Sequence, residues 1–435
     1  MNLEKLLGAL ATTRSEGRAI AGWSVYVAET RRTGVGTKDG DTGSPHAPIT
    51  LADALTARYK VIWDDGRISR GAMERRAIER EPDQILAVAH AASYEDQDAV
   101  DILGPATFPE VATEDAEALA VADGNVEAFA ARLGAIRERV TKNGIRTWSG
   151  SMHAAHGTAR VVTSAGLDVA GSGTSAGWSA TLDGELGAGH AARGLEPMRD
   201  VESRLDRLVA FVLALRAPAV ARPSGILPVI LHPDVVEDYV LGVLLHNLDG
   251  VQVAHGTGAF RKEQFGAAAA VLRDDLTLRT DPLIPMAAGA YRFSQEGLPS
   301  RPCTFVDKGR LTTPLLDLKY ARRLGLAPTA NPSAMDTLFF EGPPSISYDD
   351  ALASAAGGAL VLSVLGVHTQ DFTSGDFSLS APQTLAVGPN GLKGRLRATI
   401  SGNVFELLRS PKLTLVRFPG EHTPGLLIHC RLDPA

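Results

Sequence analysis

The chain has 435 residues, with 43 Lys and Arg against 50 Asp and Glu, which gives a formal net charge of −7 at neutral pH. This mildly acidic balance argues against a protein that coats nucleic acid, and 44% hydrophobic with 21% charged residues excludes a disordered or coiled-coil chain. The two cysteines, Cys303 and Cys430, are too few for a disulfide scaffold, so we expect reduced thiols.

The N-terminal sequence lacks a signal-peptide pattern, because Glu4 and Lys5 come early and no long apolar stretch follows. The most apolar segments, 208–221 and 357–367, are shorter than the roughly 20 residues that a membrane-spanning helix needs. We therefore expect a cytoplasmic protein that does not enter a membrane. The length favours two domains.

Helical patterns dominate the N-terminal third of the sequence. Thr50 fits the N-cap of a helix over 50–60, and the apolar spacing over 69–93 predicts helix that Pro82 breaks or restarts. A further helical region is predicted over 114–142, where apolar residues recur every three or four positions.

The hydrophobic period changes after Gly144. Three β-prone segments, 158–163, 166–170 and 178–182, are separated by Gly- and Ser-rich turns, which indicates a meander of strands. An apolar stripe then predicts a helix over 201–215. The first half of the chain therefore combines helices and strands.

A linker with three prolines covers 217–228, and we place a domain boundary near residue 222. The prediction is an N-terminal α/β domain with long helices over 1–222 and a C-terminal β-rich domain over 223–435, an α+β protein overall.

The C-terminal domain is expected to begin with a strand over 226–231 and a helix over 234–248, for which Gly250 is the natural stop. The short strands that follow, with Gly, Asp and Asn turns, predict a mainly antiparallel, barrel-like or strongly curved sheet. These strands are predicted over 301–306, 310–318, 337–340, 359–364, 377–387, 394–399, 412–416 and 425–432.

Three motif-like patterns lack the context that their chemistry requires. Residues 173–177 spell G-T-S-A-G, but strand-like residues follow where a serine hydrolase needs a helix. The glycines of 34–40 have the wrong spacing for a dinucleotide-binding loop and predict a turn. His153 and His156 have no third metal ligand nearby.

The small basic patches lack interleaved aromatic residues, so we expect no nucleic-acid partner.

His246 stands near the end of an apolar helical segment and deserves comparison with zinc-peptidase helices. Such helices carry two histidines on one face and a Glu that deprotonates the metal-bound water. Here Asn247 follows the histidine, and the next histidine is His255, nine residues on. At about 100° per residue the two rings would point in opposite directions, so a self-contained metal site is not expected.

Two segments of the C-terminal half resemble the TldD/PmbA family, the metallopeptidase-related proteins once called modulators of DNA gyrase. The segments are 272–334 and 371–410, and Ala330 replaces a glycine that is usual in the family. Similarity to the family pattern is carried by Asp274, Asp275, Glu296, Gly297, Gly309, Leu311, Ala321, Arg322, Gly325, Thr329, Asn331, Thr373, Gly375, Phe377, Ser378, Gly402 and Asn403.

The resemblance implies that TldD-type chains bind zinc through H-E-x-x-x-H, while PmbA/TldE-type partners lack this motif. Laid on the present sequence, the motif falls on His246, Asn247 and Val251. An amide does not take a proton from water and an aliphatic side chain does not bind zinc. Cys430 lacks the flanking glycines of the family's ligand cysteine. The chain is thus expected to hold no catalytic residue, metal or cofactor of its own.

The resemblance further implies a non-catalytic subunit that forms a heterodimer with a zinc-bearing TldD-like chain, or a homodimer, and helps to degrade unfolded or modified peptides. Residues predicted to face an extended peptide are His246, Asn247, Asp249 and His255. Two other functions stay open. One is a tailoring enzyme of a natural-product pathway that uses His246, His255 or Glu296; the other is a regulatory binding protein.

Overall fold

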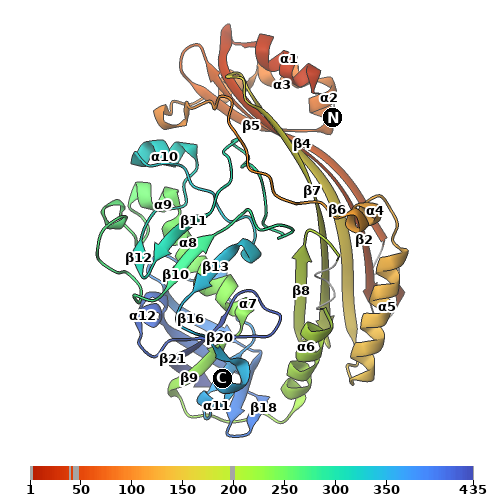
Figure 1. The fold of residues 1–435 in the computed structure, drawn as a ribbon, viewed down its shortest axis with the longest axis vertical. Coiled ribbons are helices and arrows are strands. Elements are labelled where there is room, and N and C mark those ends of the chain that lie inside the picture. The colour runs from red at the N-terminus through yellow and green to blue at the C-terminus, as the bar shows by residue number, and fades with distance from the viewer. Residues whose placement is uncertain (1–2, 39–40, 43–48, 196–200, 435) are drawn as a thin grey trace.

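The computed structural model describes residues 3–38, 41–42, 49–195 and 201–434, which form three sheets flanked by helices (Figure 1). The sheets have eight, four and nine strands. This arrangement confirms the predicted α+β class with a C-terminal region of mainly antiparallel strands. Within the described residues, no helix is long and apolar enough to cross a membrane.

The first sheet is built from long antiparallel strands in the order β5–β4–β2–β6–β7–β8. Figure 1 shows it as a curved wall that runs from the upper end of the molecule down one side. Its strands are β1 (Arg14–Ser15), β2 (Arg18–Lys38), β3 (Asp41–Thr42), β4 (Ile49–Trp63), β5 (Ile68–Glu74), β6 (Trp148–Thr163), β7 (Asp168–Leu182) and β8 (Leu186–Ala192).

One helix predicted in this region is wrong, and a second is wrong in its first part. Residues 50–60 belong to strand β4, and the first part of 69–93 is strand β5. Every second side chain of β4 from Leu55 to Trp63 is buried, and this alternation is the period of a strand. The burial of one face of the strand outweighs the helical propensity of its alanines and leucines. Helices α2 (Arg75–Arg80) and α3 (Pro82–Ala87) follow, with Pro82 restarting the helix as predicted.

The turn predicted over 34–40 is also wrong in its first part, because Gly34 and Gly36 lie within strand β2. Residues 39–40 fall outside the described residues. A Cβ atom at Gly34 would lie 2.8 Å from Oγ1 of Thr50 on the adjacent strand. The glycine therefore serves close packing on the sheet surface and not a turn.

The outer face of this sheet carries the helices. The predicted helical region 114–142 is confirmed as α4 (Ala116–Ala122) and α5 (Glu127–Lys142), and 201–215 as α6 (Val201–Arg216). Helix α1 (Glu4–Thr12) packs with α2 and α3 on the upper part of the same face. Figure 1 shows α4 and α5 on the side of the sheet that points away from the C-terminal region.

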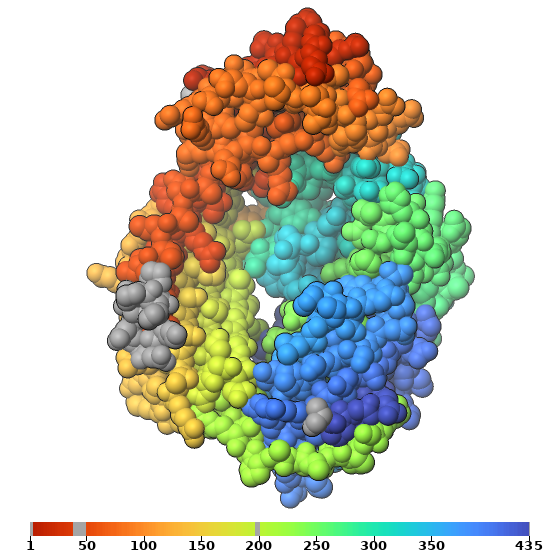
Figure 2. Space-filling model, turned by 180° about the vertical axis from the view of Figure 1, so that it is seen from behind, coloured from red at the N-terminus to blue at the C-terminus, as the bar shows by residue number. Residues whose placement is uncertain are grey.

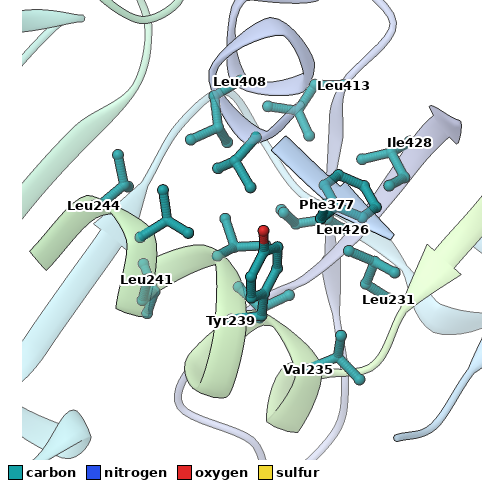
Figure 3. Packing of buried hydrophobic residues seen from close by; sticks show 14 of the residues in the cluster. Leu231, Val235, Tyr239, Leu241, Leu244, Phe377, Leu408, Leu413, Leu426 and Ile428 are labelled. Atoms are coloured by element: carbon teal, nitrogen blue, oxygen red, sulfur yellow. The ribbon is translucent and has the colours of Figure 1, made fainter. Parts of the chain in front are cut away.

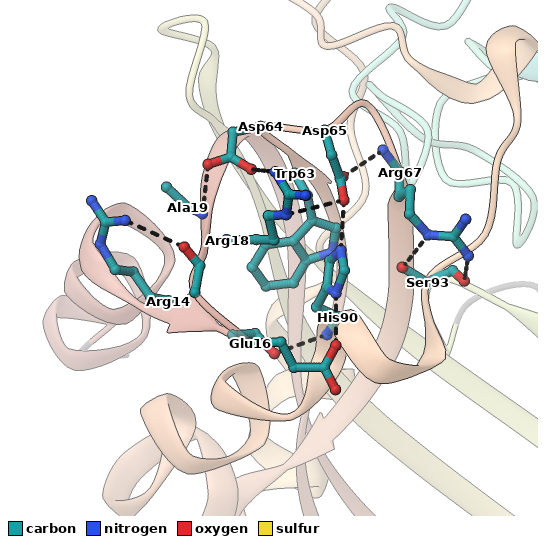
Figure 4. A network of polar contacts seen from close by, with 12 residues as sticks. Arg14, Glu16, Arg18, Ala19, Trp63, Asp64, Asp65, Arg67, His90 and Ser93 are labelled. Atoms are coloured by element: carbon teal, nitrogen blue, oxygen red, sulfur yellow. Dashed lines mark hydrogen bonds and ion pairs between the residues drawn. The ribbon is translucent and has the colours of Figure 1, made fainter.

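A polar network closes the upper end of the molecule around His90, in the 3₁₀ helix η1 (Ala89–Ala92) (Figure 4). Its ring nitrogens lie 3.0 Å from Glu16 and 2.9 Å from Asp65, and its edge meets the ring of Trp63. The two carboxylates raise the pKa of His90, and the hydrogen bond to Glu16 is the largest single cause. This network joins three segments distant in sequence.

The C-terminal region holds a four-stranded sheet, β12–β11–β10–β13, and a nine-stranded sheet with β9 between β21 and β15. Its strands are β9 (Gly225–Leu231), β10 (Thr277–Thr280), β11 (Cys303–Asp307), β12 (Arg310–Leu311), β13 (Leu338–Glu341), β14 (Ile346–Ser347), β15 (Ala359–Val361), β16 (Asp376–Ala381), β17 (Thr384–Gly388), β18 (Gly391–Arg395), β19 (Ala398–Asn403), β20 (Thr414–Arg417) and β21 (Gly425–Pro434). Its helices include α10 (Leu318–Leu324), α11 (Tyr348–Ser354) and α12 (Val404–Arg409).

Most strands predicted here are confirmed, with three differences. The strand predicted over 310–318 ends at Leu311, because Pro314 lacks a backbone donor and Asp317 caps helix α10. The predicted strand 377–387 is two strands, β16 and β17, which residues 382–383 separate. Likewise, 394–399 covers the end of β18 and the start of β19.

The core of the C-terminal region lies between the nine-stranded sheet and the helical segment that follows β9 (Figure 3). Tyr239, Leu241 and Leu244 of this segment point toward Phe377 and Leu426 of the sheet. A second core joins α6 and the first sheet to side chains of β9, β15 and β17. Residues 217–224 connect α6 to β9, where the domain boundary was predicted.

The inner face of the first sheet is turned toward the C-terminal region, and Figure 2 shows the molecule hollowed between the two. Arginines bridge the gap at its edges. Arg193 donates hydrogen bonds to the carbonyls of Ala287 and Ala290, and Arg292 donates to the carbonyl of Pro109 at 3.0 Å. These contacts hold the sheet over the segment that precedes β11.

Candidate functional site

The predicted site residues lie on the helical segment after β9, formed by α7 (Pro233–Val235), η4 (Val236–Leu241), α8 (Gly242–Leu248) and α9 (Gly250–His255). The helix predicted over 234–248 is confirmed. Its middle part, η4, is a π-helix, a rare form that is frequent at functional sites. The segment thus carries a conformational irregularity one turn before His246.

Gly250 does not end the helix, as the sequence suggested, but begins a new one. Asp249 is extended and caps α9 by accepting a hydrogen bond from the Val251 amide at 2.7 Å. The Gly250 amide donates to the Leu315 carbonyl at 2.9 Å, and a Cβ at Gly250 would lie 2.8 Å from that oxygen. The helix therefore breaks because the backbone at Gly250 forms a hydrogen bond with the backbone at Leu315, so close that a side chain would not fit.

His246 is half-buried on α8. Its ring meets the ring of Phe372 edge-on, with centroids 5.9 Å apart, and Phe372 in turn contacts Tyr239. Asp371, beside Phe372, accepts a hydrogen bond from the Thr373 amide at 2.9 Å. That bond is the largest cause holding the pKa of Asp371 below its usual range, and His246 contributes to the same effect. His246 therefore faces a loop that carries a negatively charged carboxylate, that of Asp371.

Asn247 is completely buried, and each polar function of its amide has a protein partner. Its Nδ2 donates to the carbonyls of Val243 at 2.9 Å and Phe372 at 2.7 Å, while its Oδ1 accepts from the Ala259 amide at 2.5 Å. Two donors and one acceptor are what an amide offers and an ionised carboxylate does not. Asn247 therefore joins α8 to two loops, and its side chain faces the interior.

Asp249 and His255 have different surroundings from the first two residues. Asp249 is half-buried and holds the helix break, while the exposed His255 ends α9 with its ring 6.2 Å from that of Tyr320. The structure thus places the four predicted residues on one segment but against two neighbours, the Phe372 loop and the start of α10. Their contact with a substrate stays a prediction.

The zinc site that the family resemblance implies can be tested on the same segment. His246 could supply one nitrogen ligand. The amide of Asn247 is occupied by hydrogen bonds within the protein, and the side chain of the exposed Val251 has no atom that binds a metal. The helix also breaks between His246 and Val251. The donor set at these three positions therefore does not fit zinc. Elsewhere in the described ranges, no cluster of three or more His, Cys, Asp or Glu is spaced for a metal.

The two cysteines lie on different sheets, Cys303 on β11 and Cys430 on β21. Burial raises the pKa of the Cys303 thiol to about 11 and that of Cys430 to about 12. Both thiols are therefore protonated at neutral pH.

An interdomain cavity of about 610 Å³ lies at the opposite end of the helical segment, and sequence reasoning missed it. From α6, Arg204 reaches Glu421 at 2.8 Å. Burial raises the pKa of Glu237 and Asp238, which line the cavity from η4. The other wall of the cavity comes from the C-terminal region, which is distant in sequence. The one local signal for this cavity was therefore the spacing of Arg204 and Arg207 on α6.

The residues that carry the family resemblance mostly shape turns. Gly309 has a φ of 74°, and a Cβ there would lie 2.5 Å from the Leu272 carbonyl oxygen, so only glycine fits. Gly325 ends α10 in the left-handed conformation. The Thr329 hydroxyl accepts a hydrogen bond from the Leu316 amide at 2.7 Å. These residues explain a shared fold and do not by themselves show a shared reaction.

Comparisons with known structures agree with this fold. A TldE from Thermococcus kodakarensis has a TM-score of 0.76 at 19% identity, over 99% of this chain and 98% of that one. Candidate modulators of DNA gyrase from Thermotoga maritima and Bacteroides thetaiotaomicron have TM-scores of 0.78 and 0.77 at 19% and 17% identity, covering 99% and 100% of this chain and 100% and 98% of theirs. At these identities the likeness shows the fold alone.

Sequence comparison finds similarity to a known domain family in the C-terminal half of the chain. Residues 224–427 match the model of the PmbA/TldA metallopeptidase C-terminal domain. A metalloprotease TldD homolog from Haemophilus influenzae is 25% identical over 226 residues, which are 48% of this chain and 44% of that protein. The match thus spans less than half the length of this curated relative. Residues 224–427 are therefore similar to the C-terminal domain of the PmbA/TldA metallopeptidase family, and the whole chain shares the fold of the solved structures named above.

Proposed function

We propose that this chain is a TldE/PmbA-like, non-catalytic subunit that pairs in the cytoplasm with a zinc-bearing TldD-like chain to cut unfolded or modified peptides. The observation that carries the proposal is the set of hydrogen bonds made by Asn247. At the position of the family's general base, the side chain is a buried amide with internal partners on both sides. Such a group neither activates water nor reaches a substrate.

The inner face of the first sheet supports a role in enclosing an extended peptide. Directly paired positions on β2, β6 and β7 carry small side chains, and Thr30, Gly157 and Gly173 stand side by side. A cavity of about 250 Å³ separates these positions from residues 290–293. Small side chains leave space between the sheet and residues 290–293, and we propose that an extended chain lies in this space, held by contacts with the groove walls.

The test is co-expression with a TldD-like chain, followed by size-exclusion chromatography, zinc analysis and hydrolysis of an unstructured fluorogenic peptide. We expect one stable complex, with zinc carried by the partner and full activity only in the complex. Two chains that elute separately, and a partner equally active alone, would refute the proposed subunit role.

A pair of variants tests the inner face within that complex. Gly157→Val places a branched side chain on the inner face, where a Cβ meets only Thr30 and Glu29 at 3.5 and 3.7 Å. The control Thr158→Val alters the neighbouring position, which points to the other face. We expect the first variant to lower peptide hydrolysis about tenfold at unchanged complex formation, and the control to have little effect.

A further inference from the structure

A third cavity, of about 280 Å³, lies at the upper end of the inner face, away from the helical segment described above. Strands β2, β4 and β5 form one wall, and residues 101–103, 295–296 and the start of α10 form the other. Figure 1 shows α10 just below the end of the sheet that carries β5. The cavity therefore lies between the two halves of the chain.

Three cations meet on the sheet side of this cavity, and we call them the basic pocket: Arg58, Lys60 and Arg70. Arg58 and Lys60 are two residues apart on β4, so their side chains share the inner face. Arg70 on β5 is the direct cross-strand partner of Lys60. Like charges placed directly opposite each other weaken a sheet. Such an arrangement calls for an anion that offsets the repulsion.

The carboxylates near the basic pocket have other partners. Glu296 accepts a hydrogen bond from the Leu318 amide at 2.9 Å, Asp317 caps α10, and the Asp101 carboxylate pairs with Arg322. Among the described residues, neither Arg58 nor Arg70 forms an ion pair with a carboxylate. Lys60 thus lies near the carboxylates of Glu296, Asp101 and Asp317, each of which already has another partner.

The basic pocket is also held in place. Lys60 donates to the carbonyl of Asp101 at 2.6 Å, and Arg58 donates to Oε1 of Gln295 at 2.9 Å. Burial lowers the pKa of Lys60 while the charge of Glu296 opposes that shift. Tyr26, next to Arg58 on the inner face, adds a hydroxyl to the cavity wall. Fixed donors of this kind suit an oxyanion, which accepts several charge-assisted hydrogen bonds.

We infer that the basic pocket binds a small oxyanion, either the carboxylate of a peptide or inorganic phosphate. Guanidinium groups at the mouth and a half-buried ammonium behind them match the planar carboxylate and the tetrahedral phosphate alike. The inference does not depend on the proposed subunit role, because it concerns this chain alone.

The experiment is isothermal titration of the purified full chain with two probes at low ionic strength, inorganic phosphate and an N-acetylated dipeptide with a free C-terminal carboxylate. The C-terminal amide of the same dipeptide is the control ligand. Binding of the free acid but not the amide identifies a peptide carboxylate as the ligand, and binding of phosphate alone identifies phosphate. Both results support the oxyanion pocket, whereas binding of neither probe refutes it.

Two variants assign the binding to named residues. Arg70→Gln and Arg58→Gln are each expected to weaken binding about tenfold or more, and Arg80→Gln on the exposed surface of α2 to leave it unchanged. Without ligand, Arg70→Gln should keep or raise the thermal midpoint, because it removes the like charge opposite Lys60. Unchanged affinity in both variants would contradict the assignment. If one variant does not fold, the other decides.

Discussion

Two polar regions of this molecule differ in how their hydrogen-bonding capacity is used. At Asn247, both donors and the acceptor of a buried amide are bound within the protein. In the basic pocket, Arg58, Lys60 and Arg70 stand together, and the carboxylates that line the same cavity have other partners. The comparison teaches that the amide of Asn247 is committed to the fold, while Arg58 and Arg70, which form no ion pair with a carboxylate among the described residues, lie in a different part of the molecule.

Substitution of Asn247 should have the largest effect on stability. Asn247→Leu leaves the Phe372 carbonyl and the Ala259 amide without their partner in a buried site, which should lower the free energy of unfolding by about 3 kcal/mol. Urea unfolding followed by circular dichroism measures this loss. The matched control is Val251→Ala on the exposed side of α9, which should change stability by less than about 0.5 kcal/mol. Equal values for both variants would remove the structural role of Asn247.

The helix break should be the next most sensitive position. Gly250→Ala forces a methyl group against the Leu315 carbonyl and Leu316, at 2.8 Å from each, and should cost about 2 kcal/mol. Gly134→Ala on α5, where an added Cβ meets no atom within 4 Å, is the matched control and should be neutral or stabilising. The same urea titration compares them. A neutral Gly250→Ala would show that α9 can shift away from residue 315.

Binding of an oxyanion should also stabilise the chain, since a ligand that binds only the folded state shifts the unfolding equilibrium. At a ligand concentration 100 times the dissociation constant, the gain is about 2.7 kcal/mol for the parent chain, and it should fall by about half for a variant with tenfold weaker affinity. Thermal unfolding of the parent chain and Arg70→Gln, with and without the probe that binds, measures both gains. An identical gain in the two proteins would contradict the basic pocket.

The polar network around His90 should give the smallest effect and is a useful contrast, because its charges are balanced. Glu16 and Asp65 raise the pKa of His90 in the folded chain, so its stabilisation is complete below the unfolded pKa of about 6.5 and is lost as the pH rises through the folded value. His90→Gln should therefore remove a decline in stability as the pH rises above about 6.5. An unchanged pH profile of urea unfolding would show that the network does not respond to protonation.

The sequence predicted the helices and strands whose residues pack locally, and failed where pairing is distant. The apolar stripe of α6 and the apolar run of β9 could be recognised because residues close together in the sequence define both patterns. Strand β4 was mistaken for a helix, because its alternation became decisive only through pairing with β2, whose paired residues lie 14 to 43 positions upstream. Local propensity is a weak guide against such pairing.

The candidate sites show the same limit. The motif comparison identified Asn247, but its partner Phe372 lies 125 residues away, so the internal use of its amide was not readable. Lys60 and Arg70 are unremarkable in sequence, and only the register of β4 and β5 makes them neighbours. Glu296, named as a candidate for a different enzyme activity, lies in the same cavity beside them.

The most direct test of the central claim is a peptidase assay and zinc determination on the purified chain without any partner. Our account predicts no hydrolysis of an unstructured peptide above the buffer rate, less than stoichiometric zinc, and no change on adding a chelator. Hydrolysis by the isolated chain that a chelator abolishes and zinc restores would contradict it.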